Sequence, residues 1–272
     1  MQSDKEHKKP SNIVFNCYHQ RNWEGEHFVP EHTLSYQIAG SLTFNDGINE
    51  YISSNGSFRF LRRNQLMKFM KQPPENGEYQ SVSIYLDQQT LKDYSLEYGI
   101  VGKHTIDDIK ILNLKKSKLL SGYIDSLFTY QKMGGLERQE LMNLKLKEAI
   151  TLSLITNPEL KNVLFDFTDP HKIDLEAFMN KNYHFNVKLE RFAYLTGRSL
   201  ATFKRDFEHT FNSPPGRWLQ KKRLEQAYYL ITRKGKTASD VYLELGFEDL
   251  SHFSFVFKKM FGKSPSRISS TQ

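Results

Sequence analysis

The sequence predicts an α+β protein, with a small β-barrel and a pair of helices first and an all-helical part after them. Three observations predict this fold class. Apolar residues alternate with polar ones over roughly the first 110 residues. They then recur at helical spacing, and an aromatic motif occurs twice in the last third of the chain. The 272 residues are enough for two domains, each with its own core.

The predicted strands begin with apolar residues that alternate from Leu34 to Phe44. The Asp46-Gly47 pair that follows is typical of a hairpin, because Asp-Gly tolerates a positive φ. Several short strands separated by turns favour a small barrel or a sandwich. Two further extended runs and a Pro/Gly-rich loop complete the pattern, at residues 57–61, 81–86 and 73–77.

A helical pair is predicted after the strands. Apolar residues recur at helical spacing over 119–128, and Gly134-Gly135 is expected to end that helix. A second helix is expected over 136–155, with apolar residues along one face. The pair could serve as a lid over the barrel or as a dimer interface. The broad apolar stripe on both helices favours self-association.

The charge is divided unevenly along the chain. The net charge is +7, but residues 1–170 carry 20 Lys/Arg and 21 Asp/Glu, a net of −1, and residues 171–272 carry 18 and 10, a net of +8. The division coincides with a predicted linker at Thr168–His171, so we expect domains over 1–168 and 171–272. Such asymmetry indicates a polyanionic partner for the second domain, although a basic, solvated domain would look the same.

Composition excludes several classes of protein. Hydrophobic residues (38%) and charged residues (25%) are present at ordinary levels, so the chain is neither disordered nor collagenous. A single cysteine, Cys17, excludes an intramolecular disulfide framework and a Cys-rich zinc module. Met1–Pro10 is polar, and the longest near-apolar run, Ala149–Ile155, is too short to span a membrane. A soluble, cytoplasmic protein is therefore expected.

The repeated motif predicts two helix–turn–helix units. In each copy a glycine allows the sharp turn, and three phenylalanines form the buried face of the second helix. A Ser-Pro pair after each copy is expected to start the next helix, and residues 218–231 are expected to form a long helix between the units. The copies are Ala193-x3-Gly197-x5-Phe203-x3-Phe207-x3-Phe211-x2-Pro214 and Tyr242-x3-Gly246-x6-Phe253-x3-Phe257-x3-Phe261-x3-Pro265.

The residues that face away from the phenylalanines are candidates for contacts with DNA. An exposed helix N-terminus of this kind enters the major groove, where Arg and Lys can donate to guanine and Thr or Ala can contact the thymine methyl. A solvated, charged face would account for any one of them equally well. The candidates are Arg198, Ser199, Ala201, Thr202, Lys204 and Arg205 in the first copy, and Leu250, Ser251, His252, Phe255, Lys258 and Lys259 in the second.

Residues 174–268 resemble the C-terminal domain of the AraC-type (AraC/XylS) transcription regulators. The resemblance implies a sequence-specific regulator of transcription, an activator, that binds double-stranded DNA as a homodimer and has RNA polymerase as a partner. It assigns base contacts to Ala201, Lys204 and Arg205 and to the exposed face of the second unit. The motifs that carry it are Phe203-x-Arg205-x-Phe207, Ser213-Pro214, Trp218, Val241-Tyr242-x3-Gly246-Phe247, Phe253-x3-Phe257-Lys258 and Ser264-Pro265.

Two residues depart from the family pattern. Tyr242 stands where the family has a small residue, which requires local repacking, and Phe255 stands at a position that is commonly polar. The second unit is therefore expected either to contact a thymine methyl or only to follow the DNA backbone. The N-terminal half is similar in layout to the cupin-like barrel and helical pair of the family, which implies dimerisation and an unknown small-molecule or protein effector.

The alternative is a metal-binding cupin-type barrel enzyme with an appended basic helical module. It would use residues that are close in the sequence and chemically suited to a metal. No His-x-His pair with a later Glu and His accompanies them, and no phosphate-binding loop or nucleophile motif is present in the sequence. We therefore expect no catalytic residue, no metal and no cofactor. The residues of this alternative are His19, Glu26, His27, Glu31 and His32.

Overall fold

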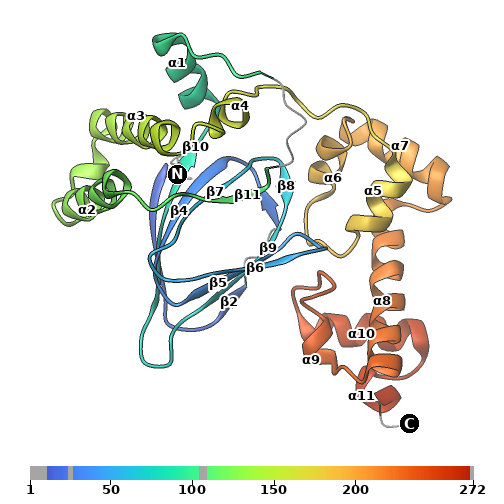
Figure 1. Cartoon of the computed structure of the whole chain (residues 1–272). Coiled ribbons are helices and arrows are strands. Elements are labelled where there is room, and N and C mark those ends of the chain that lie inside the picture. Colours follow the sequence, from blue (N-terminus) through green and yellow to red (C-terminus); the bar gives the residue numbers. More distant parts are fainter. Residues whose placement is uncertain (1–10, 24–26, 104–108, 270–272) are drawn as a thin grey trace, which may run out of the picture.

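The computed structural model describes residues 11–23, 27–103 and 109–269. The polar start of the chain, Met1–Pro10, and Glu26 of the metal alternative lie outside these residues. Figure 1 shows a strand-rich region with helices against one side, and a separate helical region that contains the C-terminal end. This is the α+β arrangement that the sequence predicts.

The strands form three antiparallel sheets, so the expected barrel does not close as a single sheet. The five-stranded sheet has the order β1-β10-β4-β7-β11, formed by β1 (Ile13–Tyr18), β10 (Tyr79–Leu86), β4 (His32–Ala39), β7 (Phe58–Leu61) and β11 (Ile111–Asn113). The four-stranded sheet has the order β2-β9-β5-β6, formed by β2 (Asn22–Trp23), β9 (Lys68–Gln72), β5 (Ser41–Asn45) and β6 (Glu50–Ser53). The third sheet pairs β3 (Phe28–Val29) with β8 (Gln65–Leu66).

The alternation in the sequence separates the two faces of the five-stranded sheet. Leu34, Phe60 and Ile84 are completely buried in the core that this sheet shares with the helices. Their neighbours Thr33 and Ser83 point the other way, into a cavity that the four-stranded sheet also lines. The predicted hairpin is confirmed, because β5 and β6 pair across Asp46-Gly47.

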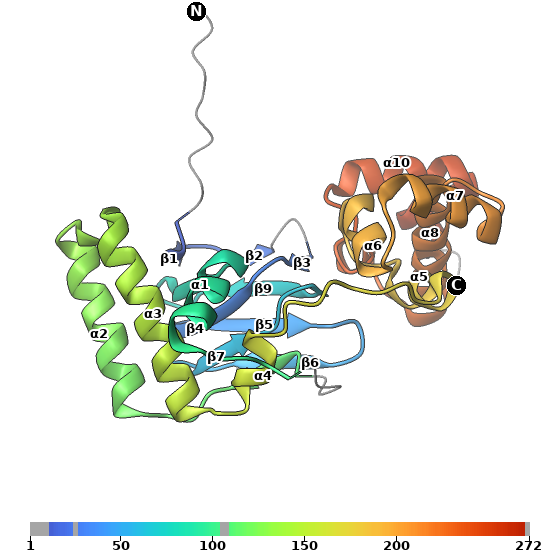
Figure 2. The same cartoon turned by 90° about the horizontal axis from the view of Figure 1, so that it is seen from above.

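Four helices accompany the strands: α1 (Gln88–Tyr98), α2 (Lys118–Lys132), α3 (Gln139–Thr156) and α4 (Leu160–Leu164). The predicted pair α2 and α3 is confirmed, with α3 beginning three residues later than expected because a 3₁₀ turn (Gly135–Glu137) comes first. The helix α1 was not predicted, since only Leu91 and Tyr94 of it are buried. Seen from above, α2 and α3 form the end of the molecule farthest from the helical region (Figure 2).

The helical region contains α5 (Leu175–Asn182), α6 (Leu189–Leu195), α7 (Leu200–Phe211), α8 (Pro215–Lys234), α9 (Ala238–Val241), α10 (Leu250–Phe261) and α11 (Pro265–Ser269). The repeat corresponds to α6–α7 and α9–α10, joined by the long helix α8 as predicted. Ser213 was expected to cap α8, but Pro214 is the N-cap and Pro215 begins the helix. The predicted linker residues Thr168–His171 form no helix or strand.

The phenylalanine stripes form the cores of the two units. Phe203 and Phe207 are completely buried in one cluster, and Phe253 and Phe257 in another. Among the described residues, no helix is both long and apolar enough to cross a membrane.

Candidate nucleic-acid interface and barrel cavity

The helix α7 is held so that its N-terminal turn is exposed. Gly197 precedes it with φ +65°, and a Cβ there would lie 2.3 Å from the carbonyl carbon of His171, so only glycine fits. Ser199 caps the helix by accepting a hydrogen bond from the Thr202 backbone N–H. Ser199, Ala201, Lys204 and Arg205 are exposed, and Thr202 is half-buried. Five of the six predicted residues of the first unit therefore form one accessible surface.

Arg198 is the sixth, and its side chain is engaged within the protein. Its Nε donates to Asp206 Oδ2 at 3.1 Å, and its Nη1 donates to the carbonyl of Ile173 at 3.0 Å. Only 6% of the Arg198 side chain is exposed. Hydrogen bonding from Arg198 is the first cause that lowers the pKa of the Asp206 carboxyl. Arg198 thus fixes α7 against the segment that enters the helical region.

The helix α10 is arranged in the same way. Asp249 caps it by accepting from the His252 backbone N–H at 2.6 Å. All the predicted residues of this unit except Leu250, which is half-buried, are exposed: Ser251, His252, Phe255, Lys258 and Lys259. The Phe255 ring is 67% exposed. Tyr242 is half-buried against the core of the second unit, so the larger residue is accommodated there.

Arg223, in the middle of α8, connects the two units. Its Nε and Nη2 donate to the carbonyls of Tyr183 and Phe185 in the first unit, at 2.8 and 2.7 Å. Its Nη1 donates to the carbonyl of Gly246 in the second unit at 3.0 Å. Burial lowers the pKa of this guanidinium to about 10, which leaves it protonated at neutral pH. The orientation of one unit relative to the other therefore depends on a single buried cation and three carbonyl groups.

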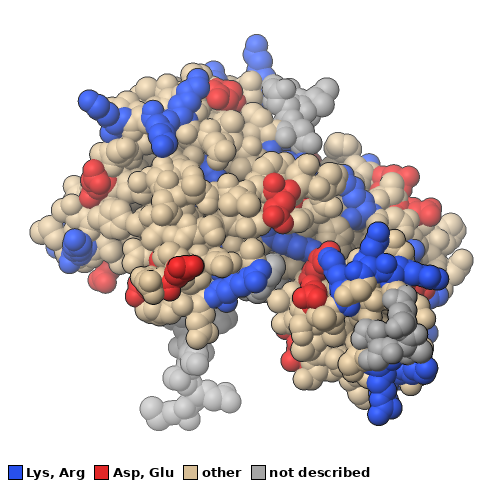
Figure 3. All heavy atoms as spheres, turned by 60° about the horizontal axis from the view of Figure 1, so that its bottom comes forward, with Lys and Arg blue, Asp and Glu red and all other residues tan. Residues whose placement is uncertain are grey.

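Positive charge is visible on the helical region. In Figure 3, Lys and Arg side chains gather on the right-hand lobe, which is the C-terminal part of the chain, with fewer Asp and Glu among them. This distribution agrees with the net charge of +8 over residues 171–272. Two exposed helix faces on one basic lobe are what binding to a DNA duplex requires.

Family models match two long stretches of the chain. A helix-turn-helix domain matches residues 192–270, and an ExsA N-terminal regulatory domain matches residues 32–165. The transcriptional regulator ExsA of Pseudomonas aeruginosa is 25% identical over 240 residues, which cover 85% of this chain and 83% of ExsA. The chain belongs to the AraC-type transcription regulators.

Further relatives match shorter segments. The virulence regulon transcriptional activator VirF of Yersinia enterocolitica is 32% identical over 98 residues, 36% of each chain. A crystal structure of apo ToxT from Vibrio cholerae covers 96% of this chain and 97% of its own, at 15% identity and a TM-score of 0.41. Like its relatives, this AraC-type protein is a DNA-binding regulator of transcription, and the enzyme alternative gains no support.

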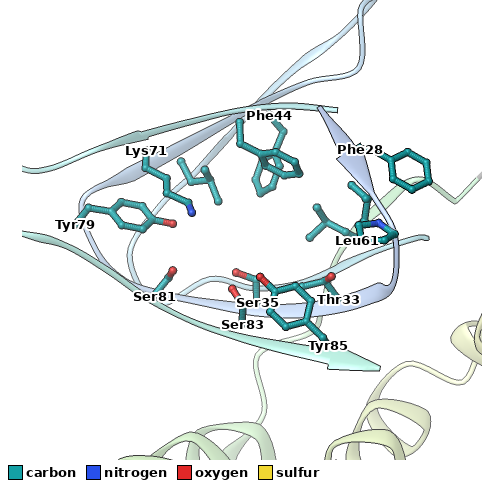
Figure 4. Close-up of a pocket in the computed structure, with 14 residues that line it drawn as sticks. Phe28, Thr33, Ser35, Phe44, Leu61, Lys71, Tyr79, Ser81, Ser83 and Tyr85 are labelled. Carbon is teal, nitrogen blue, oxygen red and sulfur yellow. The ribbon is translucent and has the colours of Figure 1, made fainter. Parts of the chain in front are cut away.

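The strand-rich region of this AraC-type chain encloses a cavity of about 220 Å³. Figure 4 shows hydroxyl groups of the five-stranded sheet on one side of it and Phe44 on the other, with the Lys71 ammonium and the Tyr79 hydroxyl at one end. The polar side comprises Thr33, Ser35, Ser81, Ser83 and Tyr85, and the apolar side includes Phe28, Leu42, Phe44, Leu61 and Phe69.

A second cation lies beside this cavity. The Arg59 guanidinium is centred 4.7 Å from the ring of Phe44, and the residue is only 2% exposed. None of its three nitrogens has a hydrogen-bond partner among the described residues. Burial lowers the pKa of Arg59 to about 10, so the group is still charged at neutral pH. An unpaired buried cation is costly, which makes Arg59 a candidate for binding an anion.

Sequence reasoning missed the contact between the two regions. The His27 backbone N–H donates to the Asn186 carbonyl, and His27 Nδ1 accepts from the Asn186 N–H, both at 3.0 Å. The Lys68 ammonium donates to the carbonyl of Glu244, in the turn before α10. Lys68 also lies 5.5 Å from the Phe185 ring centroid. The strand-rich region thus contacts both helix–turn–helix units, through residues that carry no local sequence signal.

The residues of the metal alternative do not come together. His27 contacts the helical region, and His32 Nδ1 accepts from the Arg63 backbone N–H at 3.3 Å inside the strand-rich region. Desolvation by burial lowers the pKa of both imidazoles to about 3, so both are neutral. His19 instead lies beside two residues that the sequence analysis did not single out for metal binding, Cys17 and Glu78.

Proposed function

We propose that the exposed faces of α7 and α10 bind adjacent segments of the DNA major groove, with base recognition concentrated in α7. The observation that supports this is the division of each helix into a buried aromatic face and an exposed face that carries the predicted residues. Ala201, Lys204 and Arg205 project from α7 and contact bases. Ser199 and Thr202, at the helix N-terminus, contact phosphates.

The second unit contributes differently. Phe255 presents an apolar ring where hydrogen bonding to a base would need a polar group. We assign to it a contact with a thymine methyl, while Ser251 and His252 follow the backbone and Lys258 and Lys259 supply affinity that does not depend on sequence. The side chain of Arg198 positions α7 from inside the protein and contacts no base.

Selection of DNA ligands from a random pool by the full chain tests this assignment. We expect a consensus with one strongly defined segment and, about one helical turn away, a weaker segment rich in A·T pairs. Phe255→Ser should relax the preference for T in the weaker segment and leave the strong segment unchanged. Equal affinity for selected and scrambled duplexes at physiological salt would refute the assignment.

The protein acts as a homodimer through α2 and α3 in this proposal, and as an activator that contacts RNA polymerase. Leu144 and Ile155 are 63% and 61% exposed, and their spacing of three helical turns places them on one face of α3. That face lies at the end of the molecule away from the helical region (Figure 2). Two copies can therefore join there without covering α7 or α10.

The cavity of the strand-rich region holds the effector, and we assign to it an amphipathic molecule with an anionic end. Lys71 and Arg59 supply two cations, and Leu42, Phe44 and Phe69 supply an apolar wall. Because the guanidinium of Arg59 has no partner among the described residues, an anion would relieve the cost of burying it.

Three probes that differ only in the charge of the head group test the class of effector. Octanoate should raise the melting temperature of the full chain, and octanol and octylamine should have little effect. Arg59→Met should abolish the octanoate effect without lowering the melting temperature of the free protein, because it replaces an unpaired buried cation with an apolar side chain of similar length. Equal effects of the three probes would refute an anionic ligand.

A further inference from the structure

A cluster of Cys17, His19 and Glu78 lies at the end of the β1–β10 pair. The antiparallel register places Cys17 opposite Gln80 and Tyr18 opposite Tyr79, so the end of β1 meets the start of β10. Cys17 and His19 are two residues apart, which brings them to the same side of the strand as it ends. Glu78 directly precedes β10 and lies beside both.

The donor atoms of these three side chains already converge. The Cys17 thiol donates to Glu78 Oε2 at 2.8 Å, and His19 Nδ1 lies 3.2 Å from Glu78 Oε1. One ligand atom from each residue lies within 4.8 Å of the others. Bonds of about 2.0–2.3 Å around a tetrahedral zinc ion need donors roughly 3.3–3.8 Å apart. Small side-chain rotations would therefore produce three ligand positions.

We infer that Cys17, His19 and Glu78 form a binding site for a divalent transition metal ion, with Zn²⁺ as the preferred ion. A thiolate, an imidazole and a carboxylate are the donors that Zn²⁺ takes in proteins, whereas Mg²⁺ and Ca²⁺ require oxygen donors. Binding releases the thiol proton, and the Glu78 carboxylate exchanges its hydrogen bond from Cys17 for a bond to the metal. The fourth position is left to water or to a ligand from solution.

The position of this site gives the metal a structural effect. The Tyr18 and Tyr79 rings lie 6.0 Å apart, and the Lys71 ammonium lies 4.8 Å from the Tyr18 ring centroid. Tyr79 and Lys71 line one end of the cavity (Figure 4). A metal ion that joins the end of β1 to the start of β10 would therefore hold these groups in place.

Titration of the full chain with Zn²⁺ and with Co²⁺ tests the site. We expect one ion per chain and, for Co²⁺, a thiolate-to-metal charge-transfer band that reports on Cys17, since the sequence has one cysteine. Cys17→Ser should remove the band, and His19→Ala and Glu78→Gln should each weaken Zn²⁺ binding by at least about tenfold. His209→Ala, a change at an exposed histidine of α7, is the matched control and should leave binding unchanged.

Each other outcome counts against the site. Absence of Zn²⁺ binding at micromolar concentrations would overturn it. Binding that survives all three ligand substitutions, or that His209→Ala weakens equally, would show that the metal binds elsewhere. A Co²⁺ band that persists in both His19→Ala and Glu78→Gln would show a lone thiolate. Because the variants change residues at the surface, circular dichroism should show an unchanged fold in each, and the metal dependence of the melting temperature should disappear with the site.

Discussion

Replacement of Arg223 by Met should uncouple the two helix–turn–helix units. The guanidinium makes three hydrogen bonds of 2.7–3.0 Å to backbone carbonyls on either side of α8. A hydrogen bond from a charged donor contributes about 1.5–3 kcal/mol, and each buried acceptor that loses its donor costs about 1–3 kcal/mol. Removing a buried cation recovers part of this, because its desolvation is relieved. We therefore expect a net loss of about 2–4 kcal/mol in the free energy of unfolding.

Urea denaturation followed by circular dichroism measures this loss, with Lys221→Met as the matched control. Lys221 is an exposed neighbour on α8 whose ammonium lies 3.8 Å from Glu225, and an exposed pair of this kind contributes at most about 1 kcal/mol. Footprinting adds a functional readout. The variant should still protect the segment bound by α7 but lose the fixed spacing to the segment bound by α10. A loss of stability no greater than that of Lys221→Met, together with an unchanged footprint, would refute the coupling by Arg223.

Three further predictions concern DNA binding, pH and assembly. Arg205→Ala should weaken binding to the selected site by about 1–3 kcal/mol if it contacts a base, and Lys132→Ala, the same charge change on α2, should leave the affinity for a single half-site unchanged. Burial lowers the pKa of His27 to about 3 against an ordinary 6.5, so stability is intact above pH 6.5 and should fall by about 1.4 kcal/mol per pH unit below it. His27→Asn keeps an acceptor for the Asn186 N–H without taking up a proton, so denaturation between pH 7 and 5 should show a shallower slope, and an identical slope would contradict the assignment. Leu144→Glu should shift the protein toward monomer in sedimentation velocity, whereas Leu96→Glu on α1 should not; a wild-type chain that is monomeric at all concentrations would contradict a dimer through α3.

Local patterns predicted the parts of the fold that depend on local interactions. The phenylalanines at Phe203 and Phe253 recur at helical spacing because each stripe covers one side of a single helix. The same applies to the alternation in β4, where every second residue from Leu34 enters one core. The helix α1 could not be predicted in this way. Its eleven residues bury only two side chains, so its amphipathic pattern is weak.

The parts of the site that sequence reasoning missed depend on pairs far apart in the chain. Cys17 and Glu78 are 61 residues apart, and Lys68 and Glu244 are 176 residues apart, so neither pair forms a motif. Arg198 was predicted to face DNA because it precedes the recognition helix. Its contact with the Ile173 carbonyl follows from how the incoming segment packs, which a helical wheel does not contain.

The two-stranded sheet of β3 and β8 has a consequence for how this protein can be divided. Phe28 and Leu66, from the strand-rich region, belong to the same buried cluster as Phe185, Phe192 and Phe203 of the first helix–turn–helix unit. Cutting the chain at the linker would leave that core with a missing wall. A chimaera that joins this C-terminal half to the sensor half of another regulator would therefore inherit the defect unless the side chains at Phe28 and Leu66 were carried across with it.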